Sequence, residues 1–256
     1  MFTGTYTAMI TPFRGGAIDE PALARLIQRQ IKAGVDGLVP VGTTGESATV
    51  DYAEHIRLIA LSVKFAAGKT KIIAGTGANS TKEAIYLTQE AEQAGADASL
   101  QVAPYYNKPT QEGLFQHFRA VARATRLPLI LYSIPSRCGI EIGVDTVRRL
   151  AAACPNIVSI KEAGGSVDRV SQLRAALGPK FSILSGDDSL TLPFMAVGAQ
   201  GVISVAANVV PREVVALVRA FASGDVVRAQ KWHAKLYPVF KDLFMETNPI
   251  PVKAAL

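Results

Sequence analysis

The chain has 256 residues, of which 49% are hydrophobic and 19% are charged. This length and composition provide a core for one large domain and exclude a disordered or fibrous protein. The net charge of +6 comes from scattered Lys and Arg residues with no aromatic-rich basic stretch, so we expect no nucleic-acid partner. The two cysteines, Cys138 and Cys154, belong to no CxxC or Cys/His cluster, which argues against a disulfide framework and fits a reducing cytoplasm.

The N-terminus reads directly as a β-strand and has neither the basic start nor the long apolar run of a signal peptide. The most apolar later window, residues 194–210, is interrupted by small and polar residues, whereas a membrane span needs roughly 20 apolar residues. We therefore expect a cytoplasmic protein with no membrane partner.

Eight short β-rich segments recur along the chain. The segments between them place apolar residues at helical spacing. Most of the eight are nearly all apolar, as expected for strands of a parallel sheet that is covered on both faces. Eight such units predict a (β/α)₈ TIM barrel; a doubly wound open sheet is the main alternative, but no nucleotide-binding fingerprint supports it. The predicted strands are residues 5–10, 37–41, 71–75, 98–103, 128–133, 157–162, 181–186 and 201–206.

We assign residues 1–223 to the catalytic barrel and residues 224–256 to a C-terminal helical segment. Residues 225–244 predict one additional helix, the stretch 247–251 breaks it, and residues 252–256 begin another. The chain then stops in mid-pattern, so we expect a short, apparently truncated C-terminal segment.

Active residues of a TIM barrel lie at the carboxyl ends of the strands and in the loops that follow. Lys161 ends the otherwise apolar segment 157–162, on the same face as Ile157 and Ser159. Apolar surroundings lower the pKa of a lysine from about 10.4, and the free amine can then form a Schiff base with a carbonyl. A snorkelling lysine, or one paired with Glu162, explains the position equally well.

Three further parts of the chain are expected at the same end of the barrel and complete the candidate site. Tyr132 ends the adjacent strand, where its phenol can transfer protons with Thr43 as a relay, although a core tyrosine is the better explanation of that residue alone. The loop 42–45 (Gly-Thr-Thr-Gly) can bind a carboxylate through backbone N–H groups, but it lacks the features of a Walker loop. Arg137 can hold a carboxylate in a bidentate pair, and an ordinary surface arginine is the alternative.

Asp187 and Asp188 follow the seventh strand, where many barrels bind phosphate. Carboxylates at that point repel phosphate, so we expect a non-phosphorylated substrate. We interpret both residues as caps of a helix that begins near Ser189. The three histidines have no ligand spacing, and we predict no metal site.

Taken together, these stretches resemble the superfamily of dihydrodipicolinate synthases and N-acetylneuraminate lyases, in order and from Phe2 to the last residue. Residues 104–109 (Pro-Tyr-Tyr-Asn-Lys-Pro) and 135–137 (Pro-Ser-Arg) resemble the dihydrodipicolinate synthase family in particular. The stretches that carry the resemblance are residues 42–47, 75–79, 132–137, 160–163, 184–188 and 248–253.

The resemblance implies a condensation of pyruvate with L-aspartate 4-semialdehyde that needs no cofactor, because the lysine itself forms an imine with pyruvate. It implies that Lys161 is the imine lysine, that Tyr132 is the general acid/base, and that Thr43 links Tyr132 to Tyr106. That tyrosine is lent by the adjacent subunit, so the resemblance also implies a homo-oligomer, a dimer of dimers.

By the same resemblance, Thr43 and Thr44 hold the pyruvate carboxylate and Arg137 binds the carboxylate of the semialdehyde. Gly186 and Ile203 border the site through their backbone groups. Two departures stand out. Residues 162–166 lack the threonine that members often have before the glycine, and members usually continue with a helical tail beyond the stretch 248–253.

Two other functions remain open at this point. One is a different pyruvate-dependent aldolase, such as a sialic acid or keto-deoxy-sugar lyase, which would not require Arg137 as a carboxylate clamp. The other is a catalytically silent homologue that binds a small acid, against which the joint presence of Lys161, Tyr132 and Thr43 argues.

Feedback inhibition by L-lysine is a further expectation. In lysine-sensitive members the inhibitor site uses positions that match five residues here, of which Glu83 is suited to an ammonium group. Taken singly, His55 and Glu83 are more readily explained as exposed helix residues, and Tyr52 stands where some sensitive members carry a histidine. The five positions are Ala48, His55, Asn79, Glu83 and Tyr105.

Overall fold

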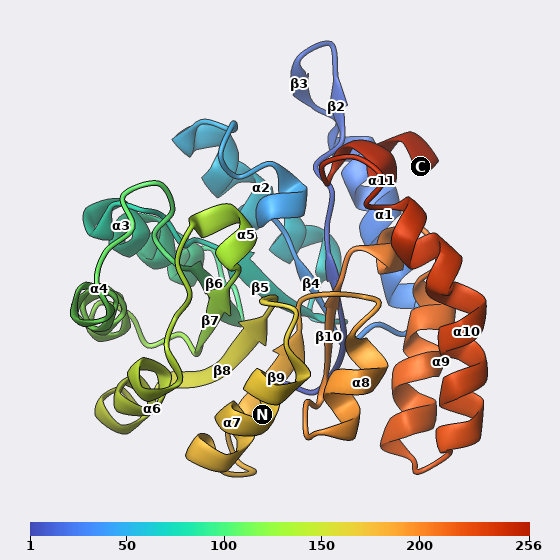
Figure 1. Cartoon of the computed structure of the whole chain (residues 1–256). Helices are drawn as coiled ribbons and strands as arrows, with labels where there is room; N and C mark the ends of the chain where they lie inside the picture. Colours follow the sequence, from blue (N-terminus) through green and yellow to red (C-terminus); the bar gives the residue numbers. More distant parts are fainter.

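The computed structural model describes residues 1–256 and contains a closed barrel of eight parallel strands (Figure 1). Each strand pairs with its neighbours in chain order, and β1 closes the barrel by pairing with both β4 and β10. The predicted TIM barrel is confirmed, and every predicted strand is present with ends that move by at most a few residues. The strands are β1 (Gly4–Ala8), β4 (Gly37–Val39), β5 (Lys71–Gly75), β6 (Ala98–Val102), β7 (Leu129–Ser133), β8 (Ile157–Glu162), β9 (Ser182–Ser185) and β10 (Gly201–Ser204).

One helix follows each strand and covers the outside of the barrel (Figure 1). Side-chain caps fix several of their starts: Asp19 accepts from the backbone of Ala22, and Asp51 forms a capping box with Glu54. The helices are α1 (Glu20–Ala33), α2 (Tyr52–Ala66), α3 (Thr81–Gln93), α4 (Gln111–Arg123), α6 (Val144–Ala153), α7 (Val167–Leu177), α8 (Thr191–Ala196) and α9 (Pro211–Ala222).

Short elements in the loops were not predicted from the sequence. A hairpin of β2 (Phe13–Arg14) and β3 (Ala17–Ile18) turns at Gly15 and Gly16, which both adopt positive φ as such a two-residue turn requires. Three single turns of helix follow strands β4, β7 and β10, and they place loop residues of the candidate site. They are η1 (Thr43–Gly45), α5 (Pro135–Cys138) and η2 (Ala206–Asn208).

The C-terminal segment forms α10 (Val226–Asp242) and α11 (Ile250–Ala255). Helix α10 packs along α9, and the chain then returns to place α11 near α1 and the β2–β3 hairpin (Figure 1). Lys253 of α11 lies 4.9 Å from the ring centre of Phe13 in that hairpin. No helix has both the length and the apolar character to cross a membrane.

The core fills the barrel and the layer between its strands and helices. Side chains such as Leu131, Ile160 and Ile183 on successive strands are fully buried, together with Phe118 and Phe194 on the surrounding helices. Because both faces of the sheet are covered in this way, a charged side chain on a strand is exceptional.

Candidate active site

Lys161 and Tyr132 lie side by side at the carboxyl ends of β8 and β7, where the strand register pairs them directly. The Nζ atom of Lys161 is 4.1 Å from the centre of the Tyr132 ring. The lysine is 5% exposed and the tyrosine 4%. Burial lowers the pKa of Lys161 to about 8, with a smaller lowering from the cation of Arg137 and an opposing rise from Asp188. About a tenth of this amine is therefore unprotonated at pH 7, far more than for a lysine with an ordinary pKa of about 10.4.

Glu162 is not the partner of Lys161. Its side chain leaves the opposite face of β8, where its Oε2 atom accepts from Arg169 Nε at 2.9 Å and its Oε1 atom accepts from the backbone of Gly164 at 2.7 Å. Glu162 is fully buried, and Arg169 also donates to Glu141. The alternatives of a snorkelling lysine and a Lys161–Glu162 ion pair are thus both wrong.

Tyr132 carries a buried phenol beside Lys161. Burial raises the pKa of its phenol to about 12, and the nearby Thr43 hydroxyl and Arg137 oppose the rise. The phenol therefore keeps its proton at neutral pH. Thr43 comes from η1 after β4, on the other side of the barrel mouth, so the fold brings the predicted relay residue to the tyrosine.

Gly186 borders Lys161 from the end of β9. A Cβ atom at this position would lie 3.0 Å from Lys161 Cε and 2.7 Å from Ala163 Cβ, so a larger residue would push the lysine aside. Its backbone N–H donates to the Glu162 carbonyl at 2.7 Å. Ile203, on β10, is fully buried at the same end of the barrel.

Asp188 was predicted to cap a helix, and this prediction is wrong. Its carboxylate accepts from Ser204 Oγ and from the backbone N–H groups of Val205 and Ala206, at 2.5, 3.0 and 2.9 Å. It thus joins the loop after β9 to the end of β10, and burial raises its pKa. Asp187 alone accepts from the backbone of Ser189, and α8 begins only at Thr191.

Thr44 and Arg137 are connected by a residue that the sequence analysis did not assign to the site. Asn248 Nδ2 donates to Thr44 Oγ1 at 3.0 Å, and Arg137 Nη2 donates to the backbone carbonyl of Asn248 at 2.9 Å. The only sequence signal for this contact is the stretch 248–253, which belongs to the resemblance but implies no role for Asn248. Its contacts cross 204 and 111 positions of the chain, which no local pattern reveals.

Two cavities meet at Arg137 and Asn248. One, of about 420 Å³, is lined by Thr43, Tyr105 and Cys138 among others. The second, of about 670 Å³, reaches Ala163 and Gly186 beside Lys161. Arg137 is itself exposed, so it lies at the entrance rather than in the interior.

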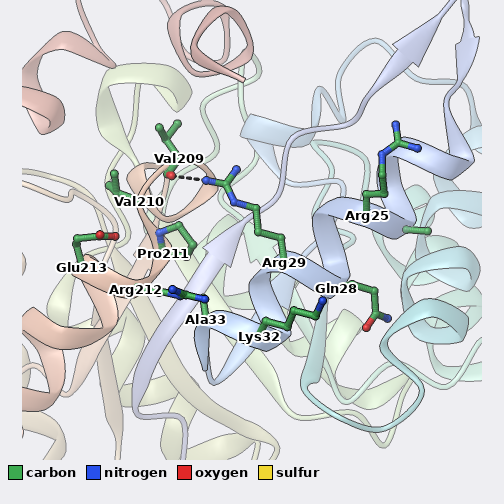
Figure 2. A pocket seen from close by; sticks show the side chains of 11 residues that line it. Arg25, Gln28, Arg29, Lys32, Ala33, Val209, Val210, Pro211, Arg212 and Glu213 are labelled. Atoms are coloured by element: carbon green, nitrogen blue, oxygen red, sulfur yellow. Dashed lines mark hydrogen bonds between the residues drawn. The ribbon is translucent and has the colours of Figure 1, made fainter.

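A third cavity, of about 720 Å³, lies between α1 and the start of α9 and contains none of the predicted site residues (Figure 2). Its rim carries the cations Arg25, Arg29, Lys32 and Arg212, and Arg29 donates to the Val209 carbonyl. No lysine at a strand end lines this cavity, and no tyrosine lies beside its cations. This cavity is therefore not a candidate for Schiff-base chemistry.

Tyr106 does not reach the other predicted catalytic residues within its own chain. Its side chain is 91% exposed and its backbone has a φ of 73°. A non-glycine residue with positive φ is strained, and such strain collects at functional positions. The structure therefore leaves Tyr106 directed away from its own core.

The residues predicted to bind L-lysine gather near the second and third helices. His55 is buried, and its Nε2 atom lies 2.7 Å from the carbonyl of Gly75, so that nitrogen carries the proton and Nδ1 is an acceptor. The alternative that His55 is an exposed helix residue is wrong. Asn79 Nδ2 donates to the backbone of Tyr105 at 3.2 Å, and Glu83 raises the pKa of Tyr105 after the larger effect of burial.

Partial desolvation and the nearby carboxylate of Glu83 raise the pKa of Tyr52, although its side chain is exposed. Ala48 is exposed and lines the 420 Å³ cavity with Tyr105. No group of three His, Cys, Asp or Glu side chains forms a metal-binding cluster in the chain.

The model of the dihydrodipicolinate synthetase family matches residues 1–256. The chain belongs to this family. A 4-hydroxy-tetrahydrodipicolinate synthase of Persephonella marina is 55% identical over 255 residues, which cover 100% of this chain and 87% of the relative. The solved 4-hydroxy-tetrahydrodipicolinate synthase of Methylacidiphilum fumariolicum SolV is 60% identical with a TM-score of 0.99, and covers 100% of this chain and 85% of that one.

A third similar structure, DHDPS from Cyanidioschyzon merolae with lysine bound, is 42% identical with a TM-score of 0.97, and the match covers 100% of this chain and 87% of that one. Family membership confirms the expected enzyme class, a Schiff-base-forming lyase. The comparisons give no support to a sialic acid or keto-deoxy-sugar lyase, or to a catalytically silent homologue.

Proposed function

We propose that this protein condenses pyruvate with L-aspartate 4-semialdehyde through a Schiff base on Lys161, and releases 4-hydroxy-tetrahydrodipicolinate for lysine and diaminopimelate biosynthesis. The observation that carries the proposal is the buried amine of Lys161, which has a pKa of about 8 and lies beside the ring of Tyr132. No external cofactor is required, because the protonated imine itself withdraws electrons from the neighbouring carbon.

The free amine of Lys161 attacks the ketone carbon of pyruvate, and the carbinolamine loses water to give the imine. Loss of a methyl proton converts the imine to an enamine, whose terminal carbon attacks the aldehyde of the semialdehyde. The amino group of that substrate then attacks the imine carbon, which closes the ring and releases Lys161. Tyr132 carries the protons of these steps, because its buried phenol is protonated at neutral pH and lies near Thr43, which serves as the relay.

Two carboxylates have to be held for this reaction. The Thr43 and Thr44 loop takes the carboxylate of pyruvate, with Gly186 and Ile203 offering backbone groups beside it. Arg137 takes the carboxylate of the semialdehyde, since it lies where the two cavities open and its guanidinium is suited to a bidentate pair.

The enzyme acts as a homo-oligomer, a dimer of dimers, in the cytoplasm. The support is Tyr106, which is exposed and strained in its own chain and is thus available to extend the Tyr132–Thr43 relay of an adjacent subunit. Residues 1–223 form the catalytic barrel and residues 224–256 the C-terminal segment.

L-lysine inhibits the enzyme by binding near Ala48, His55, Asn79, Glu83 and Tyr105. The Nδ1 acceptor of His55 suits an ammonium group, as does the carboxylate of Glu83. The structure from Cyanidioschyzon merolae with lysine bound supports the choice of ligand.

Reduction with borohydride in the presence of pyruvate tests the proposed function. One covalent adduct is expected, on Lys161, and Lys161→Ala should abolish it. Lys71→Ala, which alters an exposed lysine at the opposite end of a strand, is the matched control and should be labelled like the wild type. An adduct on another lysine, or no formation of product with the semialdehyde, would contradict the proposal.

A further inference from the structure

Asn248, which lies between α10 and α11, contacts both halves of the proposed site. Its side chain is buried, although its neighbours 244–247 are exposed. Its Nδ2 atom donates to Thr44 Oγ1 at 3.0 Å, and its backbone carbonyl accepts from Arg137 at 2.9 Å. The C-terminal segment thus reaches the residue proposed for each carboxylate.

The direction of the Asn248–Thr44 hydrogen bond decides what the threonine can do. A hydroxyl has one proton to donate and two lone pairs to accept with. Because Thr44 Oγ1 accepts from the amide, its own proton points elsewhere, and no protein group accepts it. Thr44 is 3% exposed, so this proton is free at a position that solvent hardly reaches. A ligand carboxylate is the natural acceptor.

The amide of Asn248 is also only half satisfied. Its Oδ1 atom is buried and has no hydrogen-bond partner. A buried amide oxygen without a partner costs stability, so an apolar side chain would serve better if the residue only packed the segment against the barrel. The cost is explained if the amide has a task at Thr44.

We propose that Asn248 is a positioning residue for the keto acid, and that its amide turns the Thr44 hydroxyl proton toward the carboxylate of pyruvate. The inference rests on the proposed function, since it takes Thr44 as a ligand of that carboxylate. It also makes the segment 224–256 a working part of the site rather than an appendage of the barrel.

Asn248→Asp is the decisive variant, because it keeps the shape of the side chain but replaces the donor with an acceptor. The Thr44 hydroxyl then donates to the new carboxylate and can no longer donate to the carboxylate of pyruvate. The KM for pyruvate should rise tenfold to a hundredfold, as expected for one lost charge-assisted hydrogen bond of about 1.4–2.7 kcal/mol. The KM for the semialdehyde should change much less, because Arg137 is held by the backbone carbonyl.

Two further variants separate positioning from a merely structural role. Ile250→Asp adds the same charge two residues further on, at an exposed position that lines neither cavity, and should leave the KM for pyruvate close to the wild-type value. Asn248→Ala removes the amide without capturing the hydroxyl, so its KM should lie between those of the wild type and Asn248→Asp. A packing role predicts the opposite order, because alanine leaves a cavity and aspartate does not.

A double-mutant cycle with Thr44→Val completes the test. In that background Asn248→Asp should have little further effect on the KM for pyruvate, since the hydroxyl that it captures is gone. An undiminished effect there, or an Asn248→Asp enzyme that binds pyruvate like Ile250→Asp, would overturn the inference. Borohydride labelling of Lys161 in the wild type separates these outcomes from a failure of the proposed function.

Discussion

The Nζ atom of Lys161 lies 4.1 Å from the centre of the Tyr132 ring, at the paired ends of two neighbouring strands. The ring shields the amine from water on one side and presents a phenol that keeps its proton at neutral pH. The same burial that lowers the pKa of the lysine raises that of the tyrosine, because both shifts disfavour the charged form. An amine with a lowered pKa and a phenol that keeps its proton are thereby placed together.

The rate of imine formation should rise with pH up to about pH 8, because only the unprotonated amine of Lys161 attacks pyruvate. Asp188→Asn removes a negative charge that raises the pKa of Lys161, so the midpoint should move to lower pH. Single-turnover borohydride labelling between about pH 6 and pH 10 measures it. Asp187→Asn is the control for charge loss nearby and should shift the midpoint less. A midpoint that stays in place or rises in Asp188→Asn would contradict the electrostatic argument.

Tyr132→Phe should lower kcat by roughly 10²–10⁴, the usual loss when a general acid/base is removed. The ring remains, so the apolar cover of Lys161 and its labelling by pyruvate and borohydride should change far less. Steady-state turnover and labelling of the same preparation give the comparison. Near-normal turnover would show that Tyr132 packs the core and is not the general acid/base.

Arg137→Ala should raise the KM for the semialdehyde by roughly ten- to a hundredfold, since a charge-assisted contact is worth about 1.5–3 kcal/mol. The KM for pyruvate should change only slightly. Arg148→Ala, in which an exposed arginine on α6 loses its pair with Asp145, is the control and should affect neither constant. Equal rises for both substrates would favour a structural role for Arg137.

Mixing two inactive variants should restore activity if Tyr106 is lent between subunits. In a dimer of one Lys161→Ala chain and one Tyr106→Phe chain, the site that keeps Lys161 receives an intact tyrosine. Random reassociation should therefore restore about a quarter of the wild-type sites. Activity assays before and after subunit exchange measure this fraction. Absence of recovery, with exchange verified by mass spectrometry, would place Tyr106 outside the relay.

Millimolar L-lysine should lower the rate at saturating pyruvate, and Glu83→Gln should weaken this inhibition because the carboxylate that faces the ammonium group is neutralised. Glu90→Gln, on the same helix, breaks no side-chain hydrogen bond or ion pair and is the control. Calorimetry should show a lysine heat signal for the wild type and the control. An unchanged rate without a heat signal would remove the proposed regulatory site.

The sequence by itself determined the barrel and the side chains at its mouth. Apolar strands alternate with amphipathic helices throughout the chain. This alternation is a property of neighbouring residues, so it can be read from the sequence without knowing the tertiary contacts. Lys161 could also be identified from neighbouring residues alone. A charged side chain at the end of an apolar strand is unusual, and a functional role is one of the few reasons for it. The resemblance carried by stretches such as residues 42–47 and 132–137 then narrowed the chemistry.

The tertiary structure decided which of several possible partners each residue has. Lys161 and Glu162 are adjacent in the chain but face opposite sides of β8, so Glu162 pairs with Arg169 and leaves the amine without a counterion in contact. Asp188 binds the end of β10 instead of capping a helix, and Asn248 reaches Thr44 across 204 positions. Such contacts depend on how distant segments meet when the barrel closes, and a one-dimensional pattern does not contain that information.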